Sequence, residues 1–332
     1  MKESMYLFNP GRLSKKNSTL CFTKGSGRDK EERFLPIENI EDLYVFGSLD
    51  GNSALFNFLG KNRIPIHFFD YYENYTGSFL PKDYLLSGKM LVTQAGEYKN
   101  EKSRLQIAKQ IVSGAGKNIL KNLQYYSTRG REVSTLISEI EILVEESSTT
   151  NSVASLMGYE GNIRRRYYNS FETIMKEFPF GSRTRNPPSN EINALISFGN
   201  SLCYSVCLSQ IYHTQLNPTI GFLHEPGERR FSLALDIAEI FKPILIDRLI
   251  FRMINKKELQ ENDFDKELFG CFLKPSGREK FIKAFDERLK ETIQHRQLEK
   301  NVSYRRLIRL ECYKLEKQLL GIELYKPFVS WW

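Results

Sequence analysis

A histidine and two carboxylates lie close together in the segment GFLHEPGERRFSLALDIAEIF, residues 221–241. His224 follows an apolar run and precedes a Glu-Pro-Gly sequence, which predicts a turn. Asp236 and Glu239 are three residues apart in an apolar helical pattern, so they share one helix face. Like charges at this spacing repel each other, and a cation beside them would relieve the repulsion. The segment therefore predicts a polar site that packing alone does not explain.

A third carboxylate, Glu160, occupies the apolar stripe of a helix predicted over residues 151–178. An unpaired carboxylate is costly at such a position, so it is paired, bound to a metal, or placed at a solvent-filled cleft. Arg164, Arg165 and Arg166 follow on the same helix, and an ion pair with one of them explains Glu160 as well as a functional role does.

Taken together, Glu160, His224, Asp236 and Glu239 supply one imidazole and two or three carboxylates. This mixture suits Mg²⁺ or Mn²⁺ at an open octahedral site better than it suits structural Zn²⁺. A purely structural role for the histidine stays open. Ser232 is placed to cap the acidic helix, and Pro243 cannot donate a hydrogen bond to the carbonyl of Glu239, so the helix should loosen there.

Cationic residues surround these acids in the sequence. The chain has 48 Lys and Arg against 40 Asp and Glu, a net charge of +8. Such a surplus favours an anionic partner such as nucleic acid, although charges scattered for solubility are the alternative. Arginines beside a carboxylate-rich metal site would suit a phosphate backbone. The candidates for contact with DNA are Arg164, Arg165, Arg166, Arg183, Arg185, Arg229, Arg230 and Lys242.

The elements that must position these residues divide the chain in two. Over residues 1–85, short β-branched and aromatic segments bounded by turn residues predict a small, mostly antiparallel β domain with one short helix. Over residues 101–332 the apolar period becomes 3.6, which predicts a larger all-α domain carrying the site, with its last helices near 277–298 and 303–320. Residues 86–100 mix both signals and are expected to link the two. The predicted fold class is α+β.

The location expected from the sequence is the cytoplasm. No run of about 18 apolar residues predicts a membrane span, and the first residues lack the apolar segment of a secretory signal. The five cysteines are odd in number and form no C-x-x-C pair. Cys203 and Cys207, four residues apart, are interpreted as small buried thiols rather than metal ligands.

Four segments resemble, in this order, motifs of one known family. They are the opening YLFNPGRLSKKNSTL, then YEGNIRRRYY, then RTRNPPSNEINALISFGNSLCY, then NPTIGFLHEPGERRFSLALDIAEIFKP. The family is that of CRISPR-associated protein one, the integrase subunit of the CRISPR adaptation machinery. The resemblance covers nearly the whole chain, and the sequences of the motifs are most similar to those of members from type I systems.

This resemblance implies a ligand set and an activity. The three metal ligands of the family fall on Glu160, His224 and Glu239, with Asp236 as an auxiliary acidic group; many members have Asp at the position of Glu239. The implied activity is a metal-dependent DNA integrase and endonuclease that joins the 3′-hydroxyl of a captured double-stranded fragment to a phosphodiester at a CRISPR repeat. It also implies a homodimer formed through the β-rich domain, and the small second CRISPR-associated adaptation protein as partner.

Two other functions fit the same residues. A stand-alone metal-dependent structure-specific nuclease would use the same groups to cut without joining. A non-catalytic basic DNA-binding scaffold would instead keep Glu160, His224 and Glu239 as a buried polar network. Metal-dependent activity that is lost in His224→Ala would exclude the scaffold, and joining would exclude the plain nuclease.

Overall fold

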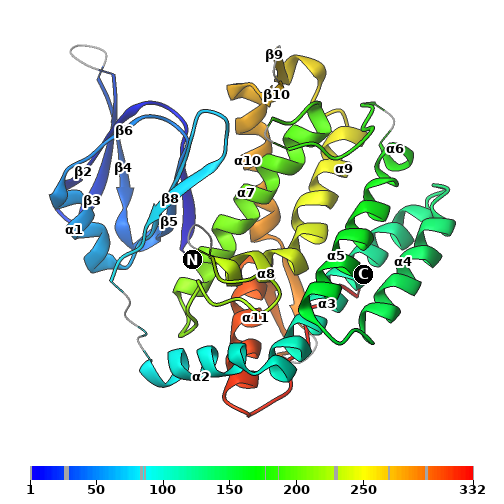
Figure 1. Cartoon of the computed structure of the whole chain (residues 1–332). Helices are drawn as coiled ribbons and strands as arrows, with labels where there is room; N and C mark the ends of the chain where they lie inside the picture. Colours follow the sequence, from blue (N-terminus) through cyan, green and yellow to red (C-terminus); the bar gives the residue numbers. More distant parts are fainter. Residues whose placement is uncertain are drawn as a thin grey trace. The chain divides into compact units, whose positions relative to one another are not determined.

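The chain folds as two units, one rich in β-strands and one mostly helical (Figure 1). The computed structural model describes residues 2–331 apart from 26–29, 83, 84, 86, 176, 186, 228–230, 268, 269, 296 and 297. The first unit is Met1–Leu86 and the second is Ser87–Trp332. The fold is therefore α+β, with a β-rich region followed by a helical region.

The N-terminal unit contains two four-stranded sheets and one helix. The first sheet has the order β1 (Glu3–Leu7), β5 (Ile40–Val45), β7 (Ile66–Phe69), β8 (Tyr75–Phe79). The second has the order β4 (Glu31–Pro36), β3 (Thr19–Lys24), β2 (Gly11–Lys16), β6 (Leu49–Asp50). The 3-10 turn η2 (Ile37–Asn39) precedes β5, and α1 (Ser53–Asn62) precedes β7. Leu13 and Leu20 of one sheet, Leu43 of the other and Leu55 of α1 belong to one apolar core.

The expectation of a mostly antiparallel β domain is confirmed only in part, because three of the six described strand pairs of this unit are parallel. Strand β5 runs parallel to both β1 and β7, and β2 runs parallel to β6. Only the hairpin pairs β2 with β3, β3 with β4, and β7 with β8 are antiparallel among the described strands of this unit. The sequence pattern marks where strands occur, but it does not reveal that α1 and the long connection after β1 bring distant strands together in parallel.

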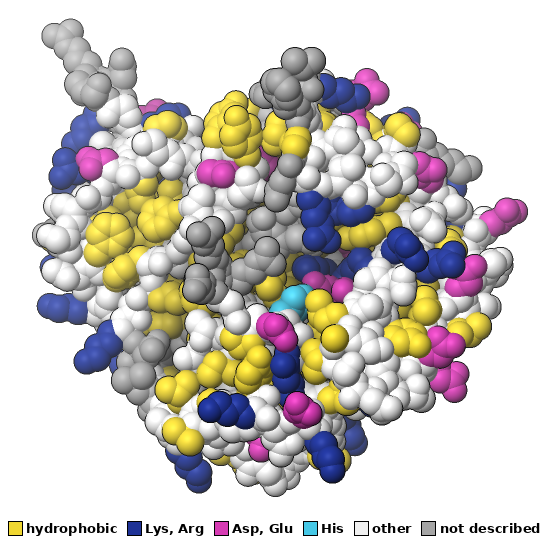
Figure 2. All heavy atoms as spheres, in the orientation of Figure 1, with side chains coloured by type: hydrophobic (Ala, Val, Ile, Leu, Met, Phe, Trp, Pro, Cys, Tyr) yellow, Lys and Arg dark blue, Asp and Glu magenta, His cyan; other side chains and the backbone are white. Residues whose placement is uncertain are grey.

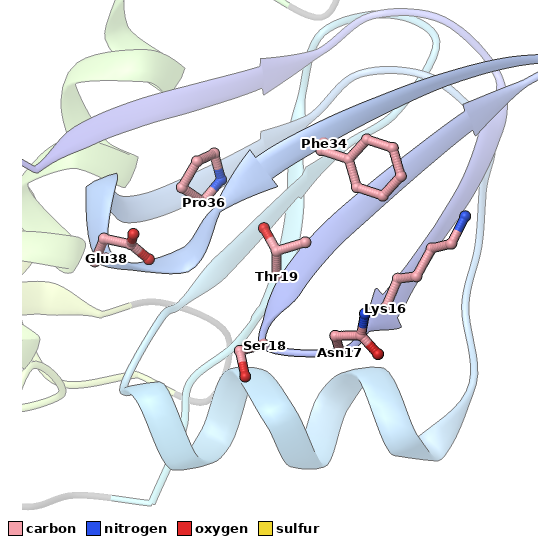
Figure 3. A pocket seen from close by; sticks show the side chains of 7 residues that line it. All are labelled: Lys16, Asn17, Ser18, Thr19, Phe34, Pro36 and Glu38. Carbon is pink, nitrogen blue, oxygen red and sulfur yellow. The ribbon is translucent and has the colours of Figure 1, made fainter.

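Figure 3 shows a pocket of the N-terminal unit beside the turn between β2 and β3. Its lining residues are Lys16, Asn17, Ser18, Thr19, Phe34, Pro36 and Glu38. The ammonium of Lys16 lies 5.0 Å from the centre of the Phe34 ring and 2.8 Å from a carboxylate oxygen of Glu32. None of the candidate catalytic residues belongs to this pocket.

The helical unit contains ten described α-helices and two short hairpins. The helices are α2 (Gly88–Lys99), α3 (Glu101–Ser127), α4 (Ser134–Ser147), α5 (Val153–Tyr168), α6 (Phe171–Ile174), α7 (Glu191–Tyr212), α8 (Ser232–Lys242), α9 (Arg248–Asn255), α10 (Pro275–Lys290) and α11 (Tyr304–Leu319). The hairpins are β9 (Phe264–Glu267) with β10 (Gly270–Leu273), after the 3-10 turn η4 (Glu261–Asp263), and β11 (Thr292–His295) with β12 (Lys300–Ser303).

Helix α8 lies at the centre of this unit. It packs against α3, α7 and α11, and all its residues except Leu235 and Lys242 are buried. At Pro243 the chain changes to one π-helical segment, η3 (Pro243–Asp247), before α9 begins. This is the loosening expected at a proline whose missing N–H leaves the Glu239 carbonyl without its helical donor. The acidic helix is thus a core helix with an irregular C-terminal end.

Four details of the helical unit correct the expectations from the sequence. The unit is not all-α, because it contains the two hairpins, and the first of them ends where α10 begins. The helix expected to reach residue 298 ends at Lys290 and is followed by β11. The helix expected over 151–178 ends at Tyr168, and the short α6 follows. Residues 88–99, expected as a linker, form α2. Short hairpins have no period long enough to recognise beside strong helical patterns.

Helix α7 is long and apolar enough, by length and composition, to cross a membrane, the only described helix of which this holds. However, 78% of its apolar window is buried inside the protein, as is typical of a core helix. Its two cysteines, Cys203 and Cys207, are free and buried, as the sequence pattern indicated. The apolar composition of α7 is therefore explained by its burial in the core of the protein.

Candidate active site

Asp236, in the second turn of α8, holds the loop that carries His224 through hydrogen bonds. One carboxylate oxygen of Asp236 accepts the backbone N–H groups of Phe222 and Leu223, at 2.6 and 3.0 Å. The other oxygen accepts the N–H of His224 at 2.9 Å. The side chain of Asp236 is fully buried, so these bonds are made without competition from water. Both oxygens of Asp236 are thus engaged in holding the loop.

Ser232 contributes to the same attachment instead of capping the helix. Its hydroxyl donates to the carbonyl of Thr219 at 2.7 Å and accepts the N–H of Gly221 at 2.8 Å. The cap position belongs to Phe231, which makes no side-chain cap bond. A Cβ on Gly221 would lie 2.9 Å from an oxygen of Asp236, so the close approach of loop and helix requires glycine here. The expected serine cap is wrong because the loop takes this hydroxyl.

His224 is oriented by the same carboxylate. Its Nδ1 lies 2.8 Å from an oxygen of Asp236, and its side chain is 21% exposed. A carboxylate only accepts, so Nδ1 carries the proton and the lone pair of the neutral ring is on Nε2. Burial opposes the charged form, but the hydrogen bond and the charge of Asp236 outweigh burial and raise the pKa of His224 above its usual value. The neutral imidazole is therefore held in one orientation, in which the lone pair of Nε2 could bind a metal ion.

Glu239 lies one turn after Asp236 and is held by two cations. Arg164, on α5, places Nη2 2.6 Å from Oε2 of Glu239. The Lys242 ammonium contacts Oε1 of the same carboxylate. Burial would raise the pKa of Glu239, but Lys242 and Arg164 outweigh it and lower that pKa to about 2. Glu239 is thus a buried, ionised carboxylate with a cation at each oxygen.

Glu160 differs from Glu239 because no described residue makes a hydrogen bond or ion pair with it. It is half-buried on α5 and close enough to Glu239, Arg164, Lys242 and His224 to respond to their charges. Burial and the charge of Glu239, in that order, raise the pKa of Glu160. The structure therefore brings Glu160, His224 and Glu239 into one electrostatic cluster.

An ion pair with one of the three following arginines was one explanation of Glu160 from the sequence, and none of the three forms it. Arg164 bonds Glu239 instead, and its Nη1 lies 3.6 Å from an oxygen of Asp247. Arg165 donates to the side chain of Asn162 at 2.9 Å. Arg166 lies 3.4 Å from a carboxylate oxygen of Glu139. Three neighbouring arginines thus serve three separate purposes.

The donor set fits a hard divalent cation in its chemistry. It offers the Nε2 of an imidazole held by a carboxylate, the carboxylate of Glu160, to which no described residue is hydrogen-bonded, and the ionised carboxylate of Glu239. As the side chains stand, no group of three or more His, Cys, Asp or Glu among the described residues is arranged around one point that could hold a metal ion. In this arrangement, Arg164 contacts one oxygen of Glu239 and Lys242 contacts the other.

Among the other candidate DNA contacts, one side chain is hydrogen-bonded within the protein and others are exposed. Arg183 donates to Asn193 at 3.0 Å and to Ser197 at 2.9 Å, both on α7. Arg185 is exposed, as are Arg165 and Arg166. Arg229 and Arg230 lie outside the described residues. On the face shown in Figure 2, Lys and Arg side chains gather beside acidic side chains and a histidine. Exposed cations are therefore available close to an acidic cluster.

Asp247 is a part of the site that the sequence interpretation missed. It is 2% exposed, lies in η3, and faces Arg164. Burial raises the pKa of Asp247 to about 6, although Arg164 and Lys242 oppose the rise. Its signal was present in the sequence, because Asp247 interrupts the apolar run KPILIDRLIF eleven residues after Asp236, which is about three helical turns.

These features describe a class of protein: two units of α+β fold, with a carboxylate and imidazole cluster and nearby arginines in the helical unit. The family model described as CRISPR associated protein Cas1 matches residues 5–287. The CRISPR-associated endonuclease Cas1 of Fusobacterium nucleatum is 45% identical over 333 residues, covering 100% of this chain and 98% of its own. The chain belongs to the Cas1 family.

Solved structures agree with this family. A CAS1 protein from Thermotoga maritima matches with a TM-score of 0.88 and 40% identity, over 97% of this chain and 99% of its own. A casposase bound to integration product also matches with a TM-score of 0.88, over 99% of this chain and 93% of its own, but at 21% identity. At that identity the second similarity establishes the shared fold alone.

Proposed function

We propose that this protein is a metal-dependent DNA endonuclease and integrase of CRISPR adaptation. The single observation that supports this proposal best is the geometry at α8. There, Asp236 holds both the loop and the imidazole of His224, next to the carboxylates of Glu160 and Glu239, in a chain of the Cas1 family. Endonuclease is also the activity named for its relative from Fusobacterium nucleatum.

Glu160, His224 and Glu239 are the residues that would hold Mg²⁺ or Mn²⁺ in this proposal, and Asp236 would orient His224. An ion bound there would lower the pKa of an attacking hydroxyl and offset charge on the scissile phosphate. The contribution of the protein is to fix the donors: Asp236 leaves the imidazole one orientation, and Arg164 fixes one oxygen of Glu239. Asp236 has no free oxygen to serve as a ligand while it holds the loop.

The reaction proposed is a transesterification. The 3′-oxygen of a captured fragment forms a bond to a phosphorus at the repeat boundary and gives up its proton. The bond from that phosphorus to the 3′-oxygen of the repeat strand breaks, and this leaving oxygen takes up a proton to become a 3′-hydroxyl. The phosphodiester count is conserved, and no covalent bond to the protein is needed. With water in place of the 3′-hydroxyl, the same groups would cut the strand.

The DNA would be held mainly through its phosphates. Exposed Arg165, Arg166 and Arg185, and also Arg229 and Arg230, are the side chains proposed for this contact. Arg183 would act by shaping the loop before α7. The proposal includes double-stranded DNA, a homodimer formed through the β-rich unit, the small second CRISPR-associated adaptation protein as partner, and a cytoplasmic location.

The test is an assay of joining with purified protein. A labelled duplex with 3′-hydroxyl ends is incubated with a supercoiled plasmid carrying a repeat array, in Mg²⁺, Mn²⁺ or EDTA, with and without the second adaptation protein. Label in the plasmid that depends on the metal supports the integrase. Nicking without joining would leave the nuclease as the function, and binding without either reaction would favour the scaffold.

A further inference from the structure

Lys242 lies in the middle of the charged cluster, although it is the last residue of α8. Its ammonium contacts Oε1 of Glu239, and its side chain is only 13% exposed. The charge of Lys242 also acts on Glu160 and on His224. One ammonium thus acts on all three side chains proposed as metal ligands, which is the electrostatic position that a bound cation would take.

The second cation at Glu239, Arg164, is fixed in a different way. Its Nη2 bonds Glu239 and its Nη1 faces Asp247, so the guanidinium is held from two sides. Lys242 has Glu239 as its one hydrogen-bonding partner among the described residues. An ammonium on a flexible four-carbon chain can change rotamer and leave, whereas a planar guanidinium held at both ends must give up two partners to do so.

The charges give a reason for a lysine at this place. Without a metal, the carboxylates of Glu160 and Glu239 repel each other, and nearby cations of the protein reduce the repulsion. A divalent ion bound by both carboxylates would repel an ammonium at the same oxygen. The ammonium and the ion are therefore alternatives at Oε1 of Glu239.

We propose that Lys242 is an internal counter-cation that occupies Glu239 in the metal-free protein and that a divalent ion must displace. This inference rests on the metal site of the proposed function and adds a regulator of its affinity. Lys242 stabilises the metal-free fold and weakens metal binding, so it limits reaction at low metal concentration. Lys242 would then not be a direct contact for DNA.

The test is a titration of the full chain with Mn²⁺ alone, in which electron paramagnetic resonance measures the free ion. We expect Lys242→Gln and Lys242→Met to lower the Kd for Mn²⁺ by about tenfold, because the ion then displaces no charge-assisted hydrogen bond at Glu239. Lys242→Arg keeps a cation and should bind about as weakly as the wild type. In EDTA, Lys242→Met should have the lower Tm, and Mn²⁺ should raise its Tm more than it raises that of the wild type.

Lys314→Gln is the matched control. Lys314 lies 2.6 Å from the buried carboxylate of Glu311, with the same spacing of three residues, but it belongs to α11. This variant should lose stability without any change in Mn²⁺ affinity. Lys242→Gln keeps a polar group beside Glu239, so it decides the question if Lys242→Met does not fold.

The outcomes separate the two proposals. If His224→Ala abolishes Mn²⁺ binding but Lys242→Gln binds no more tightly than the wild type, the role of Lys242 is wrong and the metal site stands. If His224→Ala binds Mn²⁺ as the wild type does, the metal site itself is wrong, and the role of Lys242 fails with it. Lys242→Arg keeps a cation beside Glu239. If this variant also bound Mn²⁺ more tightly than the wild type, the proposal that the ion displaces a cation would be wrong.

Discussion

At the scale of single residues, Asp236 organises the site through charge. It accepts three backbone N–H groups and contacts Nδ1 of His224, all with one buried carboxylate. An asparagine has the same size but only one accepting oxygen, and its amide would face an N–H group. The loop and the imidazole therefore depend on the carboxylate rather than on the shape of the side chain.

We predict that Asp236→Asn lowers the free energy of unfolding by about 1–3 kcal/mol. Because His224 loses its orientation, the affinity for Mn²⁺ should fall by about 10- to 100-fold. Urea unfolding and an Mn²⁺ titration measure the two effects. Asp70→Asn is the control, since Asp70 also accepts a backbone N–H, from Asn74 at 2.9 Å, but in the β-rich unit. Unchanged Mn²⁺ affinity in Asp236→Asn would contradict the orienting role.

Asp247 predicts a dependence of stability on pH. Its pKa is raised from 3.8 to about 6, so the folded state binds a proton more tightly than the unfolded state does. Its contribution to stability is therefore greatest below the unfolded pKa, and it declines as the pH rises from about 4 to 6. The difference in unfolding free energy between the wild type and Asp247→Asn should shift against the wild type over this range. A difference that is constant from pH 4 to 7 would show that Asp247 has no raised pKa.

The candidate residues could be recognised from the sequence because each interrupts an apolar pattern, as Glu160, Asp236 and Glu239 do. Their partners could not be recognised. Arg164 bonds Glu239, 75 positions away, because α5 and α8 both pack against α3, which brings the two side chains within reach. Which of three successive arginines turns inward depends on that packing, and the spacing of the residues does not determine it.

At the scale of elements, the attachment of one loop to one helix decides where His224 lies. Gly221 sits so close to α8 that a Cβ would lie 2.8 Å from the backbone carbon of Ser232. Gly227, on the same loop, has no atom of another described residue within 4 Å of the corresponding position. The two glycines therefore differ in their need for the missing side chain.

We predict that Gly221→Ala destabilises the fold by about 1–3 kcal/mol, because the loop must move away from α8. The movement should also displace His224 and reduce joining activity. Gly227→Ala should leave both properties within the range of ordinary surface changes, about 0.5 kcal/mol. Thermal unfolding and the joining assay compare the two variants. Equal effects at both glycines would show that close packing at Gly221 is not what positions the histidine.

Helices with a clear period were predictable, and irregular elements were not. The apolar residues of segments 103–126 and 190–212 recur with a helical period, and these segments correspond to α3 and α7. Strand β11 falls inside the helix predicted near 277–298, and β12 falls mostly between that helix and the next, because these four-residue strands carry too few apolar residues to define a period. The parallel pairing of β5 with β1 and β7 depends on contacts between distant segments, which a local pattern does not contain.

At the scale of the whole molecule, the net charge of +8 favours DNA as the partner, but the exposed arginines determine where it binds. Arg165 and Arg166 are exposed on α5, the helix that carries Glu160, whereas Arg164 between them and Glu160 is buried. A phosphate contact changes the affinity for every DNA sequence alike and makes binding dependent on salt.

We predict that Arg165→Ala combined with Arg166→Ala weakens binding to duplex DNA and lowers the slope of log affinity against log salt by about one for each phosphate that is no longer bound. Fluorescence anisotropy at several salt concentrations measures the slope. Arg33→Ala, which removes an exposed arginine of β4, is the control and should leave the slope unchanged. A slope that is unchanged in the double variant would exclude this face of α5 from the DNA contact.

The most direct test of Glu160, His224 and Glu239 as the catalytic group is the yield of joined product in Mn²⁺. The wild type, Glu160→Gln, His224→Ala and Glu239→Gln are compared, with fragments ending in a 3′-hydroxyl or a 3′-deoxy nucleotide. We predict joining only for the wild type and only with the 3′-hydroxyl, while all four proteins bind the fragment. Joining by any of the three variants at the wild-type rate would contradict the assignment of Glu160, His224 and Glu239 as the catalytic group.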